Sequence, residues 1–153
     1  MLDHAAIAAR IPHSGRMCLL ERVIHWDELG VRCSAISHRD ADNPLRESDG
    51  LPVWAGIEYA AQAAAVHAAL VHDHAVPRAG AMASLRNVEA GCEHLDRIEE
   101  DLSVEVSLLH GDPAGAIYRF DLHAGEKLLL SGQFTLMFGD LRCDRDSPAD
   151  AKP

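Results

Sequence analysis

Positive charge is scarce in this sequence. Its 153 residues include 14 Lys and Arg against 24 Asp and Glu, which gives a formal net charge of −10 at pH 7. Such acidity repels nucleic acids and anionic membranes unless basic residues cluster locally. The arginines are instead spread singly along the chain, so we expect no polyphosphate partner. Examples are Arg10, Arg32, Arg86 and Arg119.

A long uninterrupted apolar run is also missing. The N-terminus, MLDHAAIAARIPHSGR, has neither the basic leader nor the extended apolar core of a secretion signal. The most apolar stretch, residues 53–71, is interrupted by Glu58, Gln62 and His67 and is dominated by alanine, which makes it a poor membrane span. The sequence therefore predicts a cytoplasmic protein without a membrane-spanning segment.

Cysteines are few and far apart. Cys18, Cys33, Cys92 and Cys143 are separated by 15, 59 and 51 positions, and zinc sites and redox motifs use much closer pairs. We expect free thiols in a reducing compartment rather than a disulfide framework.

Histidine spacing does not indicate a metal site either. His67, His72 and His74 are five and two residues apart, which does not place two of them on one helical face. We expect solvated side chains near a helix C-terminus, where they favour the helix dipole. Neither a metal ion nor a cofactor is expected.

Helical patterns occur in two places. Asp3 can cap a short Ala-rich helix at residues 3–9. A longer helix is predicted from residue 53 to about His74, because no Gly or Pro interrupts it after Gly56. Before it, residues 39–52 form a polar loop with an Asp-Gly turn signal.

Strand patterns account for much of the remainder. Apolar and polar side chains alternate along several segments, which is typical of antiparallel strands with one buried face. Hairpin-length turns, GDPAG at 111–115 and AGEK at 124–127, connect the last three. The predicted strands are two within residues 17–38 and one each at 80–90, 102–108, 118–122 and 128–138, the last with Leu128, Leu130, Phe134, Leu136 and Phe138 on one face.

These elements indicate one domain over residues 1–140, followed by a mobile tail at 141–153 that has no apolar period. A long helix that is apolar on nearly every face needs cover nearly all round. A curved antiparallel sheet wrapped around one central helix provides that cover, an α+β architecture known as the hotdog fold. Its edge strand needs cover as well, so we expect a dimer.

Two motifs resemble a known family. IPHSGRMCLLERV at residues 11–23 is similar to the opening of the (3R)-hydroxyacyl-[acyl-carrier-protein] dehydratases, where a Leu-Pro-His-Arg stretch precedes an apolar strand. LPVWAGIEYAAQ at 51–62 resembles that family's Pro-Gly segment, which leads into a helix with Glu and, four residues later, Gln. The likeness is strongest to the dehydratase-like subgroup of the aryl polyene pathways. It implies a hotdog fold, a thioester substrate on an acyl carrier protein and a catalytic role for Glu58.

The family's site histidine has no counterpart at the matching place. In the dehydratases a His-Phe-Pro-Gly motif precedes the helix, and its His works with the Glu of the other subunit. Fourteen residues before Glu58 this sequence has Pro44, with Asn43 beside it. We therefore consider His13, His38 and Asn43 as candidate auxiliaries of Glu58. His13 has an alternative interpretation as a structural histidine that binds backbone carbonyls.

The residues around Glu58 each have a functional and a structural interpretation. Dehydration of a 3-hydroxyacyl thioester moves protons at the α-carbon and the hydroxyl, with donors on the thioester oxygen. Glu58 has apolar neighbours that suit proton transfer, or it is a first-turn acid that favours the helix dipole. Free N–H groups around Gly56 and Ile57 can hold the thioester, or Gly56 allows close packing on the sheet. Gln62 can orient Glu58 or bind the loop, and Trp54 lines either an acyl pocket or the core.

Three functions remain open. The leading hypothesis is a 3-hydroxyacyl-[acyl-carrier-protein] dehydratase of fatty-acid or aryl polyene synthesis, which would bind its acidic carrier protein through residues such as Arg16, Arg78 or Arg86. The second is a non-catalytic or half-site subunit, whose Glu58 faces a histidine of another hotdog chain. The third is an acyl thioesterase, since a helix-borne carboxylate also directs water at a thioester carbonyl. The expected assembly is a homodimer, a heterodimer with another hotdog subunit, or a higher oligomer.

Overall fold

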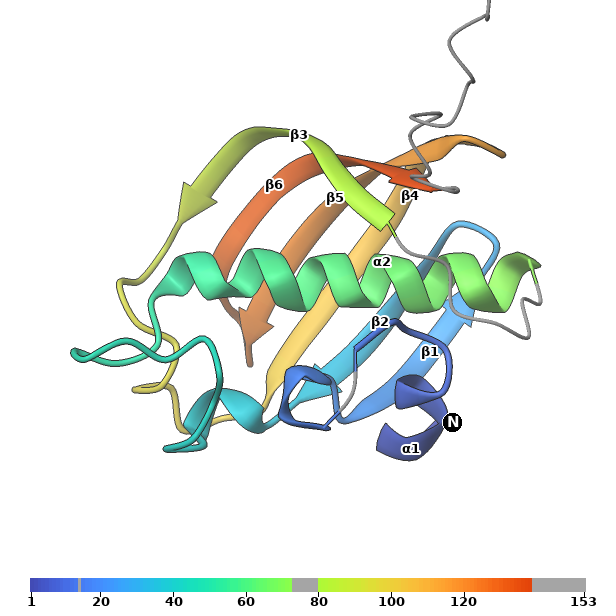
Figure 1. The fold of residues 1–153 in the computed structure, drawn as a ribbon. Coiled ribbons are helices and arrows are strands. Elements are labelled where there is room, and N and C mark those ends of the chain that lie inside the picture. The colour runs from blue at the N-terminus through green and yellow to red at the C-terminus, as the bar shows by residue number, and fades with distance from the viewer. Residues whose placement is uncertain (14, 73–79, 139–153) are drawn as a thin grey trace, which may run out of the picture.

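A curved antiparallel sheet forms the body of the protein. The computed structural model describes residues 1–13, 15–72 and 80–138. Within these ranges six strands are hydrogen-bonded in the order β1-β2-β4-β5-β6-β3, and neighbouring strands are antiparallel. Figure 1 shows the sheet curling over one long helix, α2. The main elements are α1 (His4–Ala8), β1 (Arg22–Asp27), β2 (Gly30–Ala35), α2 (Gly56–His72), β3 (Gly80–Ala90), β4 (Leu102–Asp112), β5 (Gly115–Ala124) and β6 (Lys127–Phe138).

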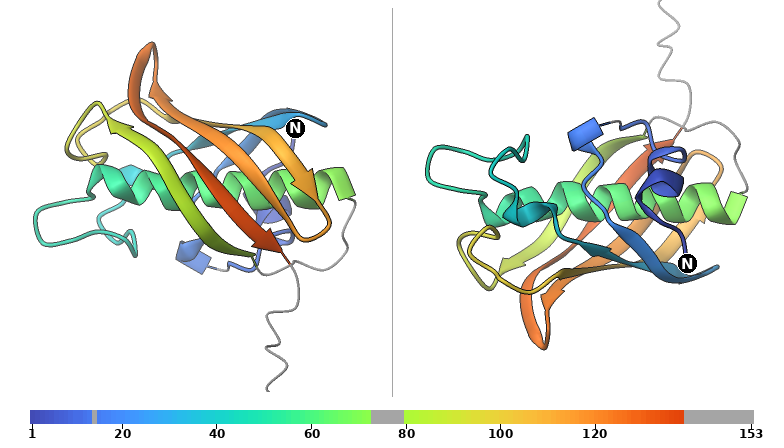
Figure 2. Two further views of the ribbon diagram at one scale, coloured as in Figure 1. Left: turned by 90° about the horizontal axis from the view of Figure 1, so that it is seen from above. Right: turned by 90° about the horizontal axis from the view of Figure 1, so that it is seen from below.

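α2 crosses the concave side of the sheet, as both views of Figure 2 show. Alanine, the best helix former, is its commonest residue, and its 17 residues contain no proline. The small side chains let the helix lie close to the strands, and Ala60, Ala63, Ala64 and Val66 are completely buried. The predicted α+β hotdog architecture, one central helix wrapped by a curved sheet, is confirmed.

The inner face of the sheet supplies the rest of the core. Along β5, Tyr118, Phe120 and Leu122 are buried, while Arg119 between them is exposed. Phe120 stacks on Phe134 of β6 with ring centroids 5.2 Å apart. The alternation along this strand therefore predicts correctly which of its faces packs toward α2.

One predicted strand face is wrong at its start. The alternation along β6 predicts Leu128 on the inner face with Leu130, but Leu128 is 42% exposed, and Leu129 and Leu130 are both buried. The cause is a β-bulge, because Leu122 pairs with Leu130 whereas the next residue, His123, pairs with Leu128. The extra residue reverses the side-chain direction of everything that precedes it in the strand.

The helix ends agree with the sequence except at the start of the long helix. Asp3 caps α1 as predicted, and its side chain accepts a backbone hydrogen bond at 2.9 Å. The long helix is predicted from residue 53, but Val53–Ala55 forms a 3-10 turn, η3, and α2 begins at Gly56. The described part of α2 ends at His72. Outside the described residues lie the predicted end of the helix at His74, Cys143 and the predicted tail at 141–153.

The two edges of the sheet differ. Leu2 forms a β-bridge with Val23 and so covers part of β1. The outer side of β3 has no strand partner in the part of the chain that the structure describes. Among the helices in these same ranges, none is long and apolar enough to cross a membrane.

Candidate active site

Glu58 lies in the first turn of α2 with its side chain about one-third exposed. Its Oε1 atom is 3.1 Å from Nε2 of His13 and 3.4 Å from Nε2 of Gln62. The exposed fractions of the His13 and Glu58 side chains are 30% and 34%. Among the described residues, nothing bonds the second carboxylate oxygen, Oε2. One oxygen is thus held by the protein, and the other is free to meet a substrate.

Gln62 ties this carboxylate to the N-terminal segment. Its Oε1 accepts a hydrogen bond of 2.9 Å from the backbone N–H of Leu19, and its Nε2 donates to the carbonyl of Met17 at 2.6 Å. Gln62 is only 1% exposed. Since α2 presents Gln62 and Glu58 one turn apart, the amide fixes the segment that carries His13 beside the carboxylate. Of the two alternatives predicted for Gln62, the bond to Glu58 is present, and the backbone that Gln62 binds is the N-terminal segment at Met17 and Leu19.

His13 is the candidate auxiliary that reaches Glu58. His13 belongs to the motif at residues 11–23. This segment runs across α2, as the blue ribbon in the right-hand view of Figure 2 shows. The second ring nitrogen, Nδ1, is buried and makes no hydrogen bond to any described residue. Among the described residues, Nδ1 of His38 and Nδ1 of His94 are likewise buried without a hydrogen bond.

His38 and Asn43 are engaged elsewhere. The buried His38 places Nε2 3.0 Å from the carbonyl oxygen of Ile98, and burial lowers the pKa of its ring. Asn43 donates to the hydroxyl of Tyr59 at 3.0 Å and accepts from the N–H of Leu45 at 2.9 Å. His38 thus binds the connection between β3 and β4, Asn43 supports the polar loop before α2, and no described contact joins either side chain to Glu58.

Gly56 serves close packing. A Cβ atom at this position would lie 2.8 Å from side-chain atoms of Leu122 and of Leu130. Its backbone N–H donates to the carbonyl of Val53 in the 3-10 turn. The expectation that this N–H is free for a thioester oxygen is wrong, because η3 extends the helical hydrogen bonding by a further turn.

One side of α2 is left open by the sheet. Trp54, just before the helix, is 54% exposed, so the interpretation of it as core is wrong. Ile57 is half-buried and packs against the core. The open face continues along α2 away from Glu58. It is formed there by three half-buried residues at helical spacing, Ala61, Ala65 and Ala68.

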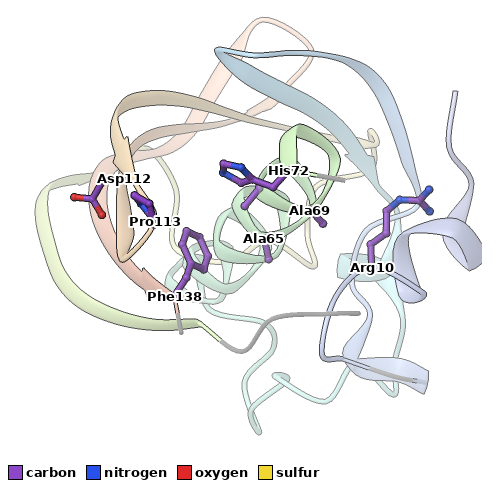
Figure 3. Close-up of a pocket in the computed structure, with 8 residues that line it drawn as sticks. Arg10, Ala65, Ala69, His72, Asp112, Pro113 and Phe138 are labelled. Carbon is purple, nitrogen blue, oxygen red and sulfur yellow. The ribbon is translucent and has the colours of Figure 1, made fainter. Parts of the chain in front are cut away.

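A cavity of about 230 Å³ lies farther along the same face. Figure 3 shows Phe138 and Pro113 on one side of it, Arg10 on the other, and Ala65 and Ala69 of α2 between them. Ala65 follows Glu58 by seven residues, which is about 10 Å along a helix. The open face therefore leads from the carboxylate toward this cavity.

His67 differs from the sequence-based expectation. It is only 1% exposed, with Nε2 2.8 Å from the carbonyl oxygen of Asp27 and Nδ1 2.9 Å from the hydroxyl of Tyr118. A carbonyl oxygen only accepts, so Nε2 carries the hydrogen and Tyr118 donates to Nδ1. Burial lowers the pKa of His67, and the Asp27 carbonyl partly offsets that effect. The prediction of a solvated His67 is wrong because the sheet curls over this side of α2, whereas His72 is exposed as predicted.

The described cysteines form no disulfide. Cys18, Cys33 and Cys92 are free thiols, and burial raises the pKa of Cys33 to about 12. In the ranges covered by the structure, no group of three or more His, Cys, Asp or Glu side chains is arranged to hold a metal ion.

Comparisons with known proteins agree with this architecture. No curated protein matches the sequence. Among solved structures, the dehydratase heterocomplex ApeI:P from Xenorhabdus doucetiae is similar with a TM-score of 0.78 and 24% identity, over 88% of this chain and 91% of that chain. AziG from S. sahachiroi has a TM-score of 0.59 and 14% identity, over 80% and 91% of the two chains. A mutant thioesterase from Pseudomonas aeruginosa has a TM-score of 0.56 and 12% identity, over 76% and 79%.

At these identities the solved structures establish the fold alone, which is the hotdog fold. The family comparison goes further, because the ApeP-like family, described as ApeP dehydratase, matches residues 5–143 and so nearly the whole chain. The protein therefore belongs to the ApeP-like dehydratases.

Proposed function

We propose that this chain is a dehydratase subunit that acts on 3-hydroxyacyl thioesters of an acyl carrier protein, with Glu58 as its catalytic carboxylate. Membership of a dehydratase family supports the reaction. The observation that carries the residue assignment is the position of Glu58, which is anchored through Oε1 and leaves Oε2 free beside the open face of α2. The resemblance to aryl polyene and fatty-acid dehydratases supports the carrier-protein thioester as the substrate.

One carboxylate can carry out both proton transfers of the dehydration. Glu58 Oε2 takes the α-proton of the substrate, and the electron pair of that C–H bond forms the new double bond. The C–O bond at the β-carbon breaks, and the hydroxyl leaves as water with the proton that Glu58 returns. The Gly56 N–H is occupied and therefore does not supply the hydrogen bond to the thioester oxygen.

A second hotdog subunit is the proposed partner at the open face. β3 has a free edge along its 11 residues, and its Met82 and Leu85 are 38% and 42% exposed. Leu85 pairs with the buried Phe134 and therefore lies on the concave side of the sheet, toward α2. An unpaired edge beside apolar side chains favours pairing with another chain. The similar ApeI:P structure is a heterocomplex, which supports a heteromer over a homodimer.

A carrier protein would dock near the exposed Arg16. This side chain lies three residues after His13 and forms an ion pair of 3.0 Å with Asp42. Exposed pairs are worth little and exchange partners readily, so Arg16 is available to an acidic surface. Arg86 lies on β3 opposite Gln133 and is the second candidate. Arg78 lies outside the described residues.

The test measures turnover of a 3-hydroxyacyl-carrier protein and of its crotonyl counterpart, by the chain alone and after mixing with a hotdog partner. We expect interconversion of the two thioesters, and Glu58→Gln should abolish it because the amide cannot exchange protons as a carboxylate does. Glu28→Gln, an exposed glutamate in the β1–β2 turn, is the control and should leave the rate unchanged.

Other outcomes separate the alternatives. Release of free thiol, instead of interconversion, would indicate a thioesterase. Turnover that appears only with the partner and survives Glu58→Gln would assign the reaction to the partner's site and this chain to a supporting role.

A further inference from the structure

The histidine beside Glu58 comes from the same chain. His13 Nε2 is 3.1 Å from Glu58 Oε1, and no loop of another subunit is needed to bring the two groups together. In the (3R)-hydroxyacyl-[acyl-carrier-protein] dehydratases that the sequence resembles, the histidine that meets the Glu of the other subunit comes from the loop before the helix. In this chain that loop has Asn43 and Pro44 at the matching place, and Asn43 is bonded to Tyr59.

The backbone that follows His13 is held by two side chains. Gln62 binds the carbonyl of Met17 and the N–H of Leu19. The hydroxyl of Ser37 donates to the carbonyl of Leu19 at 2.7 Å, and Leu19 is 1% exposed. The approach of His13 to Glu58 is therefore built into the packing of the segment against α2 and is not a chance surface contact.

Hydrogen-bonding chemistry determines how His13 acts. An ionised carboxylate only accepts, so the ring nitrogen that faces Glu58, Nε2, carries the hydrogen. The other nitrogen, Nδ1, is buried and has no partner among the described residues. Neither nitrogen is thus left free to face a substrate at the open face. His13 acts through Glu58, as a group that aims the carboxylate and bonds its inner oxygen.

We propose that His13 is the positioning residue of Glu58, which bonds the inner carboxylate oxygen and leaves the outer one directed at the open face. This inference rests on the proposed function of Glu58. Because His13 does not face the substrate, this role is compatible with the half-site hypothesis, in which Glu58 faces a histidine of another hotdog chain.

Two kinds of measurement test the pair. The first is nitrogen NMR of the histidine rings in the full chain, which distinguishes the two tautomers without any turnover. We expect His13 in the Nε2–H form, and Glu58→Gln should shift its ring signals, while the exposed His25 serves as the internal control. Averaged tautomers at His13 that do not respond to Glu58→Gln would overturn the proposal.

The second measurement is turnover of crotonyl-carrier protein by paired variants. Asn cannot reach as far as Nε2 does, so His13→Asn should lower kcat by up to about 100-fold with little change in KM, since misplacing a catalytic group by an ångström has this effect. His13→Gln places an N–H donor near the position of Nε2 and should retain most of the activity, and His25→Gln should retain all of it.

The outcomes distinguish the two proposals. A fully active His13→Asn together with an inactive Glu58→Gln removes the inference about His13 and leaves the proposed function in place. A fully active Glu58→Gln removes the proposed function. If the wild-type protein does not turn over this probe, the NMR result alone decides whether the pair exists.

Discussion

At the scale of single residues, the amide of Gln62 organises the site. Glu58 and Gln62 are close because the helix places them one turn apart, but His13 joins them only because Gln62 binds the backbone at Met17 and Leu19. The amide needs both of its functional ends for this purpose, since Oε1 accepts from an N–H and Nε2 donates to a carbonyl. A glutamine is therefore required here, rather than any polar side chain of similar size.

The first prediction follows from that requirement. Gln62→Glu preserves the shape but replaces the Nε2 donor with an acceptor that faces the Met17 carbonyl and Glu58. We expect the free energy of unfolding to fall by about 2 kcal/mol or more, because buried acceptors lose their donor. Urea denaturation measures the effect. Gln133→Glu, at a half-buried glutamine on β6, is the control, and an equal loss in both variants would show that Gln62 has no special role.

At the scale of elements, a buried histidine joins α2 to the sheet. His67 is bonded to Tyr118 of β5 and to the carbonyl of Asp27 at the end of β1, so one ring connects the helix with two strands that are far apart in sequence. His67 and Tyr118 also meet edge to face with ring centroids 5.6 Å apart. The contact holds the C-terminal half of α2 under the sheet, where the cavity of Figure 3 lies.

The free energy of unfolding should depend on pH through the buried histidines. The pKa values of His67 and His38 are both lowered in the folded protein, chiefly by burial. The unfolded chain takes up protons at these rings below about pH 6.5, whereas the folded chain does so only at lower pH. The free energy of unfolding should therefore be highest above pH 6.5 and decrease as the pH falls, by at most about 1.4 kcal/mol per pH unit for each histidine.

Urea denaturation between pH 7.5 and pH 5.5 measures this slope. His67→Gln removes one titrating ring, so its loss of stability on acidification should be smaller than that of the wild type. His25→Gln, at an exposed histidine, should keep the wild-type slope. Parallel curves for the wild type and His67→Gln would show that the buried ring does not govern the acid response.

At the scale of the whole molecule, the fold leaves one side unfinished. The free edge of β3, the exposed Trp54 and the half-buried alanines along α2 are not covered by the described part of the chain. A dehydration site works best when water is excluded, and a single chain does not enclose this one. Burial of this face by another subunit would cover its exposed apolar side chains and would also exclude water from the site.

A charge at the β3 edge should therefore disrupt assembly and activity together. Leu85→Lys places an ammonium group on the concave side of the free edge, which disfavours pairing of β3 with another strand. We expect the mass of the complex, measured by light scattering, to fall to that of the single chain, with loss of turnover. Leu109→Lys, at an exposed leucine on the interior strand β4, should leave both unchanged. An intact complex in Leu85→Lys would place the interface elsewhere.

Much of this molecule was predictable from local patterns. The alternation along residues 118–122 identifies a strand and its buried face, because neighbouring side chains in a strand point to opposite sides. The Ala-rich run identifies α2, and the spacing of Glu58 and Gln62 predicts their contact. The prediction fails at Leu128, since a bulge depends on how β6 pairs with β5 and leaves no signal in β6 itself.

The sequence by itself determined the elements, the central helix and the carboxylate on its first turn, since each of these depends on residues a few positions apart. Only the tertiary structure decided that His13 meets Glu58, that His38 and Asn43 do not, and that His67 is buried. These contacts join segments that are distant in the chain. Their partners are chosen by how the curled sheet packs on α2, which no local pattern records.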